Sequence, residues 1–221
     1  MFMVRDIKDF KNFIFDFDGT IADTYKLHEK AFHQVLDEIN VFFNYENYTG
    51  LTTDKVFTDI SHLHDLRFDK NKIDSLVFKK RKIANDLFKT SIKFIPGAEA
   101  YLNLLVKLNK NLFVASSGSS LNVNEGLKTL KIEKYFKEIV TADVVKVSKP
   151  EPDIFNYIVN KYDLAVSETV VIEDAVSGII SSNRSGLRVI CVNEEIDKSL
   201  LVNYQYGIQN YGQLYDLLNN D

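Results

Sequence analysis

The segment NFIFDFDGTIADT, from Asn12 to Thr24, begins as an apolar run and ends in two aspartates one residue apart, followed by a glycine. Residues i and i+2 of an extended segment face the same way, so Asp16 and Asp18 are expected side by side. Two carboxylates that lose hydration at a strand end repel each other unless hydrogen bonds, a proton or a cation compensates. Gly19 lets the backbone turn sharply after the pair. Taken alone, the segment fits two solvated turn residues equally well.

Runs rich in β-forming residues recur along the chain. From about Phe94 onward they alternate with helical patterns, such as AEAYLNLLVKLNK and PDIFNYIVNKYDL, in which apolar residues return every three or four positions. This alternation predicts an α/β fold with a Rossmann-like parallel sheet covered by helices. The expected strands are residues 12–17, 111–116, 138–142, 169–174 and 187–192.

One connection is much longer than the others. About ninety residues separate the first two expected strands, whereas a crossover with its helix needs only about a dozen or more. The intervening sequence contains helical patterns such as YKLHEKAFHQVLDEI and TDKVFTDISHL, in which Thr53 and Asp54 resemble helix caps. We therefore predict a helical cap domain at residues 23–91, inserted into a core made of residues 1–22 and 92–221. Pro96 and Gly97 mark the return to the core.

Composition and charge exclude several classes of protein. Apolar residues make up 45% of the 221 residues, and the formal net charge is −4, so the chain has ample material for a core and no basic field for general nucleic-acid binding. The run KKRK, Lys79–Lys82, lies in a helical pattern and wraps the helix axis. We interpret it as a solvated face, of which a subset is free to meet a substrate anion.

The single cysteine and the lack of long apolar runs indicate an intracellular protein. Cys191 lies within the apolar run LRVICV and is expected to be a buried thiol, which leaves no disulfide framework. No run approaches the roughly 18 to 20 apolar residues that span a membrane. We expect a cytoplasmic protein without a membrane, nucleic-acid or obligate protein partner.

The second and third strand ends also carry polar groups. Ser116 ends the run NLFVAS, and the small loop after it offers backbone N–H groups for an anionic oxygen. Ser119 or Ser120 explains this stretch as well if either is simply a helix N-cap. After the third strand, Pro150 keeps Lys149 out of helical geometry and leaves its ammonium group in a loop, where an ordinary turn is the alternative.

The fourth strand ends in Glu173 and Asp174, although Asp174 is equally plausible as an N-cap. Ligands of open parallel sheets bind in the crevice beyond the carboxyl ends of the strands. Four strand ends therefore bring carboxylates, a hydroxyl and an ammonium group toward one crevice. This inventory suits a phosphate held against a magnesium ion.

The chain resembles the haloacid dehalogenase superfamily of phosphotransferases in four motifs and in their order. These are D-F-D-G-T, then a strand that ends in Ser, then Lys-Pro, and last a strand that ends in Glu-Asp. The resemblance spans nearly the whole chain and includes a helical cap after the first motif. It implies that Asp16 is the nucleophile that forms an aspartyl-phosphate and that Asp18 is the general acid and base. It also implies that Ser116, Ser117 and Lys149 bind the phosphate.

The same resemblance implies a Mg²⁺ site. Its ligands would be Asp16, Asp174 and the backbone carbonyl of Asp18, with Glu173 bound directly or through water. His28 falls where β-phosphoglucomutase keeps a histidine in its first cap helix, which makes it a candidate substrate contact. An exposed helix residue is the alternative interpretation of His28.

The branch that the chain most resembles contains β-phosphoglucomutase and small-molecule phosphatases acting on sugar phosphates. The loop TGLTTDKV has Thr53 where the mutase carries a phosphate-binding arginine, and Thr20 ends the first motif as it commonly does in the phosphatases. We therefore expect a Mg²⁺-dependent phosphatase acting on a small phosphate monoester, a sugar or polyol phosphate, with a phosphosugar mutase as the alternative. A binding module that kept the fold and lost the chemistry is less favoured, because Asp16, Asp18, Lys149 and Asp174 are all present. A dinucleotide-binding Rossmann protein is a weaker alternative because no G-x-G-x-x-G follows the first strand, and a P-loop enzyme is excluded because its motif is absent from the sequence.

Overall fold

The computed structural model describes residues 7–193, 196 and 210–219. Its centre is a five-stranded sheet in the order β3-β2-β1-β4-β5, and every neighbouring pair of strands is parallel. The predicted α/β architecture is confirmed. The strands are β1 (Asn12–Phe15), β2 (Asn111–Ser116), β3 (Phe136–Thr141), β4 (Thr169–Glu173) and β5 (Arg188–Cys191).

The first strand lies in the middle of the sheet. Asn12 pairs in register with Asn111 of β2 and Thr169 of β4, and the pairing continues to Phe15. All residues of β1 are buried, as expected for a central strand covered on both faces. The carboxyl end of β1, where the two aspartates follow, is therefore flanked by the ends of β2 and β4.

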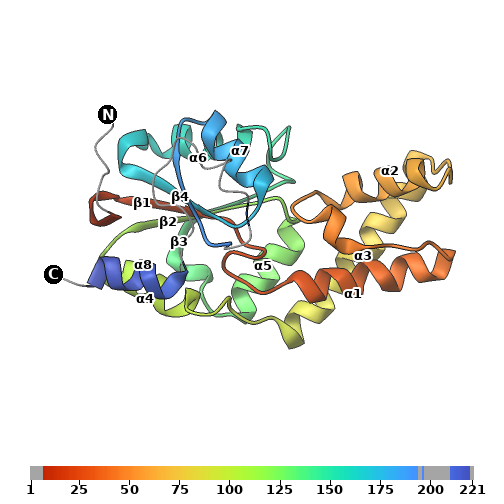
Figure 1. Cartoon of the computed structure of the whole chain (residues 1–221), viewed down its shortest axis with the longest axis horizontal. Coiled ribbons are helices and arrows are strands. Elements are labelled where there is room, and N and C mark those ends of the chain that lie inside the picture. Colours follow the sequence, from red (N-terminus) through yellow and green to blue (C-terminus); the bar gives the residue numbers. More distant parts are fainter. Residues whose placement is uncertain (1–6, 194–195, 197–209, 220–221) are drawn as a thin grey trace.

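Helices cover both faces of the sheet (Figure 1). Phe13 and Phe15 belong to the apolar cluster on one face, and Ile14 belongs to the cluster on the other, which is the alternation of a β-strand. The first face carries α4 (Ala98–Lys107), α5 (Ser120–Thr129) and α8 (Tyr211–Asn219). The second carries α6 (Asp153–Tyr162) and α7 (Val176–Arg184). Short 3-10 helices span Ile7–Asp9, Asp37–Ile39, Tyr45–Tyr48, Glu133–Tyr135 and Val166–Glu168.

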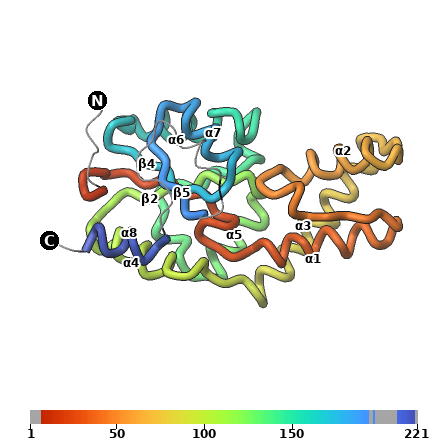
Figure 2. Tube along the Cα trace, viewed as in Figure 1, coloured from red at the N-terminus to blue at the C-terminus, as the bar shows by residue number. Residues whose placement is uncertain are grey.

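The part of the chain between β1 and α4 forms a separate helical layer, drawn at the right of Figure 1 and traced in Figure 2. It contains α1 (Tyr25–Leu36), α2 (Thr53–Leu63) and α3 (Lys70–Ser91), which enclose an apolar cluster around Phe32, Phe43 and Phe57. The N-cap of α2 is Thr52, so Thr53 and Asp54 lie inside the helix instead of capping it. The division into a core and a cap at residues 22 and 92 stays a prediction.

Two chain segments connect this helical layer to the sheet, and they lie side by side. The Asp23 N–H donates to the Lys93 carbonyl at 2.9 Å, and the Ile95 N–H donates to the Ile21 carbonyl at 2.9 Å. Ala22 and Phe94 form an antiparallel bridge between them. Because the two connections are hydrogen-bonded to each other, the helical layer is held close to the carboxyl end of β1.

Two further findings concern the predicted burial of the cysteine and the expected lack of a membrane span. Cys191 is fully buried, as expected from its apolar surroundings. Among the helices of the described residues, none is long and apolar enough to span a membrane.

Candidate active site

A cavity of about 650 Å³ lies between the carboxyl ends of the strands and the helical layer. Asp16 follows β1, Glu173 ends β4 and Lys149 lies in the loop after β3, so topology alone brings three distant segments to one place. The lining residues on the sheet side include Asp16, Asp18, Gly19, Ser117, Gly118, Lys149, Glu173 and Asp174. The predicted convergence of strand ends is therefore a feature of the structure.

The ammonium group of Lys149 lies at the floor of this cavity. Its Nζ donates to Asp16 Oδ1 at 2.7 Å, to Glu173 Oε1 at 2.5 Å and to the Ala115 carbonyl at 2.8 Å. The Lys149 side chain is only 2% exposed. Burial disfavours its charge, but the adjacent carboxylates of Asp16 and Glu173 outweigh burial and raise the pKa of Lys149 above its ordinary value. Lys149 therefore stays protonated at neutral pH.

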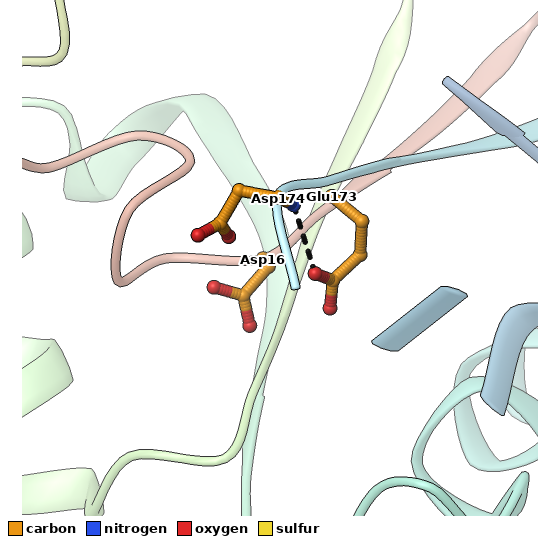
Figure 3. Close-up of side chains that lie close together, drawn as sticks. All are labelled: Asp16, Glu173 and Asp174. Atoms are coloured by element: carbon orange, nitrogen blue, oxygen red, sulfur yellow. Dashed lines mark hydrogen bonds between the residues drawn. The ribbon is translucent and has the colours of Figure 1, made fainter. Parts of the chain in front are cut away.

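Asp16, Glu173 and Asp174 form an acidic cluster beside Lys149 (Figure 3). One carboxylate oxygen from each lies within 4.8 Å of the others. Burial raises the pKa of Asp16 well above its ordinary value, and Lys149 only partly offsets this while Glu173 and Asp174 add to it. Burial, followed by the charge of Glu173, raises the pKa of Asp174 to about 7. The cluster therefore carries more negative charge than one lysine compensates.

Each member of the cluster is held by specific contacts. The Thr20 hydroxyl donates to Asp174 Oδ1 at 2.7 Å. Gly19 has φ +80, and a Cβ at this position would lie 2.2 Å from Asp174 Oδ2, so both the backbone turn and the close approach require glycine. Asp174 precedes Ala175, which is the N-cap of α7, so the N-cap interpretation of Asp174 is wrong.

Glu173 is more fully engaged than the two aspartates. Its Oε2 accepts from the Asp174 and Ala175 N–H groups, each at 3.0 Å, while its Oε1 accepts from Lys149. Gly178 of α7 makes room for this carboxylate, because a Cβ there would lie 1.6 Å from Glu173 Oε1. Both Glu173 oxygens thus accept hydrogen bonds, whereas the side-chain donors described for Asp16 and Asp174 engage Oδ1 of each.

The chemistry of these donors fits a hard divalent cation. Oxygen ligands with surplus negative charge are what Mg²⁺ binds, usually through one or two carboxylates together with phosphate oxygens and water. Asp16 and Asp174 line the cavity and meet this description. The contacts of Glu173 favour a place behind them, orienting Lys149 and the start of α7.

Asp18 lies in a different environment from Asp16. Its Oδ1 accepts from the Thr24 hydroxyl at 2.7 Å and lies 3.0 Å from His28 Nε2. Burial alone raises the pKa of Asp18, but His28 and Thr24 outweigh burial and lower it below the ordinary value. The two aspartates of the first motif are thus shifted in opposite directions by their surroundings.

His28 is itself held by a buried lysine from the helical layer. Lys80 Nζ lies 2.8 Å from His28 Nδ1 and 4.3 Å from the centre of the Phe32 ring. Burial, followed by the charge of Lys80, lowers the pKa of His28, so the ring is neutral and accepts from Lys80 while its Nε2–H donates to Asp18. Burial lowers the pKa of Lys80 to about 7. Lys80, His28 and Asp18 form one hydrogen-bonded row from α3 to the first motif.

This row decides between the alternatives that the sequence left open for His28 and for the KKRK run. His28 is 8% exposed, so its interpretation as an exposed helix residue is wrong. Lys80 is 3% exposed and lines the cavity, so the KKRK run is not wholly a solvated face. Its flanking members do face outward, with Lys79 paired to Glu38 and Lys82 exposed. The missed signal is the four-residue spacing of Lys80 from Leu76 and Ala84, which places it on the buried stripe of α3.

The loop after β2 contributes through Ser117 and Gly118, which line the cavity. Ser116 is buried, and its Oγ accepts from the Gly118 N–H at 2.9 Å, which shapes the loop. Ser119 is the N-cap of α5 and accepts from the Asn122 N–H. The cap interpretation of Ser119 is therefore confirmed, and it coexists with a loop that borders the cavity.

The helical layer supplies the opposite wall. Tyr25, Phe32 and Tyr45 present aromatic rings there, and Glu46 and Thr53 also line the wall. Two other cations of the helical layer, Lys55 and Lys79, form exposed ion pairs with Asp59 and Glu38. Of the cations in this part of the described chain, Lys80 is the one that reaches the cavity.

Comparisons with known proteins agree with this architecture. Residues 13–192 match the haloacid dehalogenase-like hydrolase family. Hexitol phosphatase A of Escherichia coli is 30% identical over 196 residues, covering 85% of each chain. Beta-phosphoglucomutase of Bacillus subtilis is 26% identical over 191 residues, covering 83% of this chain and 84% of its own.

A solved structure gives the same fold. The crystal structure of a hydrolase from Pseudomonas syringae aligns with a TM-score of 0.80 at 24% identity, over 93% of this chain and 96% of that one. The family match covers all the strand ends that border the cavity. The chain therefore belongs to the haloacid dehalogenase-like hydrolase family, in the branch that contains phosphatases and β-phosphoglucomutases.

Proposed function

We propose that the protein is a Mg²⁺-dependent phosphatase that hydrolyses a small phosphate monoester, a sugar or polyol phosphate, through an aspartyl-phosphate. The observation that carries this proposal is the contrast between Asp16 and Asp18. Asp16 lies in the acidic cluster with Lys149, whereas Asp18 lies against Thr24 and His28. Two carboxylates in one cavity with different surroundings are suited to two different chemical roles.

In the proposed reaction, the Asp16 carboxylate attacks phosphorus in line, and the bond from phosphorus to the ester oxygen breaks as the new bond forms. Asp18, protonated in the substrate complex, gives its proton to the departing alcohol oxygen. Water then attacks the phosphorus of the aspartyl-phosphate while Asp18 takes back a proton. Inorganic phosphate leaves and Asp16 is regenerated, so each cycle consumes one ester and one water.

Lys149 and the loop of Ser116 and Ser117 would hold the phosphoryl oxygens. The three donor hydrogens of Lys149 point at oxygens in the ligand-free site, and a phosphate oxygen can replace Asp16 as one acceptor. Asp16, Asp174 and the Asp18 carbonyl would hold Mg²⁺, with Glu173 supporting them. The cation would supply the positive charge that this site needs to keep Asp16 ionised beside a phosphate.

Asp18 must gain a proton before it can act as an acid, although its pKa is low in the ligand-free site. A phosphate dianion brought close to Asp18 raises the pKa of this carboxyl by like-charge repulsion. His28 and Thr24 keep the side chain oriented during that change. Lys80 holds His28 in the tautomer that donates to Asp18.

A mutase is the second candidate, favoured by the β-phosphoglucomutase relative. A mutase needs a second phosphate site opposite the nucleophile, commonly a bidentate arginine. Thr53 stands at the corresponding position, in the first turn of α2, while Lys55 and Lys79 are engaged in exposed pairs. These contacts support water as the normal acceptor of the phosphoryl group.

The test is a panel of phosphate monoesters with purified protein and Mg²⁺, with released phosphate measured for each. One arm uses β-glucose 1-phosphate with a trace of the 1,6-bisphosphate and measures glucose 6-phosphate beside free phosphate. Phosphate release from a sugar or polyol phosphate, lost in Asp16→Asn, is expected. Isomerised sugar phosphate forming much faster than free phosphate would establish the mutase instead, and no turnover of any ester would leave a binding module.

A further inference from the structure

The wall of the cavity opposite the acidic cluster carries the aromatic rings of Tyr25, Phe32 and Tyr45. The rings of Tyr25 and Tyr45 lie 5.0 Å apart between centroids, and those of Phe32 and Tyr45 lie 5.5 Å apart. The hydroxyl groups of Thr49 and Thr53 lie along the same wall. Rings beside hydroxyl groups suit a leaving group with C–H faces and many hydroxyls.

The charges on this wall are few and unequal. Lys80 is buried, and its ammonium group is committed to His28 and the Phe32 ring. Glu46 is exposed and lines the cavity, and within the described part of the chain its carboxylate forms no ion pair. A substrate in the cavity therefore faces a negative charge without an ion-pair partner on the wall that the helical layer supplies.

We propose that Glu46 is a charge filter that restricts the substrate to the monophosphate of an uncharged polyhydroxyl compound. This inference rests on the proposed phosphatase function and specifies its substrate class. Glu46 accepts hydrogen bonds from hydroxyl groups and repels a second phosphate or a carboxylate at the far end of the substrate. Bisphosphates and phosphorylated sugar acids are thereby disfavoured, because specificity is a difference between two binding free energies.

Two probes of nearly equal size isolate the charge. Glucitol 6-phosphate and 6-phosphogluconate have the same carbon chain and differ at the end remote from the phosphate, where a hydroxymethyl group replaces a carboxylate. The kcat/KM ratio of these two esters is measured for the parent, for Glu46→Gln and for Glu38→Gln. Glu38 provides the matched control because it lies on the helical layer outside the cavity lining, paired with Lys79.

The parent is expected to favour glucitol 6-phosphate by about tenfold or more, the effect of roughly 1.4 kcal/mol. Glu46→Gln should bring the ratio close to one, and Glu38→Gln should leave it at the parent value. Raising the salt from about 0.05 M to about 0.5 M should shrink the preference of the parent, because an exposed charge is screened.

An unchanged ratio in Glu46→Gln, or no preference in the parent, would overturn the filter. Hydrolysis of p-nitrophenyl phosphate by the parent separates this failure from failure of the proposed function. If the parent hydrolyses that ester but neither probe, the substrate class is wrong and the phosphatase assignment stands. If it hydrolyses none of the three with Mg²⁺ present, the phosphatase assignment fails and the filter fails with it.

Discussion

The substitution Lys149→Met tests whether the buried ion pairs under the cavity have the strength that their geometry implies. Lys149 compensates one of the two carboxylates that it contacts, and burial, with a further contribution from Glu173 and Asp174, raises the pKa of Asp16. Methionine fills a similar volume but leaves one more carboxylate without a partner. The free energy of unfolding in metal-free buffer is therefore expected to fall.

The size of this loss can be worked out from protonation. A buried carboxyl without a partner takes up a proton on folding, which from an unfolded pKa of about 3.9 costs about 4 kcal/mol at pH 7 and about 2 kcal/mol at pH 5.5. The pH 7 value agrees with the roughly 3–5 kcal/mol typical of breaking a buried pair. The folded variant binds more protons than its unfolded state, so its stability relative to the parent falls as the pH rises through this window.

Urea unfolding followed by circular dichroism, with chelator present, measures the effect at both pH values. Lys161→Met is the matched control, because Lys161 pairs with Glu138 but its side chain is 44% exposed. Added Mg²⁺ should stabilise Lys149→Met more than the parent, since the cation meets one more uncompensated charge. A loss no larger than that of Lys161→Met, or one equal at pH 5.5 and pH 7, would refute this account of the site.

Three further predictions concern activity. Asp16→Asn should lower kcat/KM by about 10⁴-fold or more with the circular dichroism spectrum retained, and a variant that keeps a tenth of parent activity excludes Asp16 as the nucleophile. Chelator should abolish turnover, Mg²⁺ should restore it and Ca²⁺ should restore it poorly, whereas full activity in excess chelator contradicts the metal site. Lys80→Met should lower kcat/KM by about 10²-fold, because His28 loses the contact that orients it toward Asp18. Lys82→Met, on the exposed face of α3, should match the parent. Equal activity of the two variants argues against the hydrogen-bonded row from Lys80 to Asp18.

The order of strands and helices was predictable because each expected strand is an apolar run bounded by turn residues. Some boundaries were not. The edge strand β3 begins at Phe136, two residues before the expected start at Glu138, because its pairing with β2 shifts register between Leu112 and Phe113. The first strand ends at Phe15, two residues before the expected end at Phe17, although the Asp16 N–H still donates to the Ile172 carbonyl of β4. Both deviations arise from pairing, which a single run of sequence does not encode.

The sheet side of the candidate site was predictable for a topological reason. Carboxyl ends of neighbouring parallel strands share one edge, so Asp16 and Glu173, at the ends of β1 and β4, were expected to lie close together. Lys149 joins them from the loop after β3. The helical side was harder, because Lys80 lies in a run of four cations of which the others face outward or pair with the surface. The burial of Lys80 depends on how α3 packs against α1, and this tertiary contact cannot be inferred from the local sequence.

Asp18 links these two sides. Its partners are Thr24, at the exit from the sheet, and His28 on α1, and His28 is held in turn by Lys80 on α3. The hydrogen bonds that lower the pKa of Asp18 therefore require the helical layer to lie against the sheet. Moving α1 and α3 away would remove the contributions of His28 and Lys80, which lower the pKa of Asp18, and would leave the hydrogen bond from Thr24. The protonation of Asp18 and the position of the helical layer are thus coupled through three side chains, and the coupling must act in both directions.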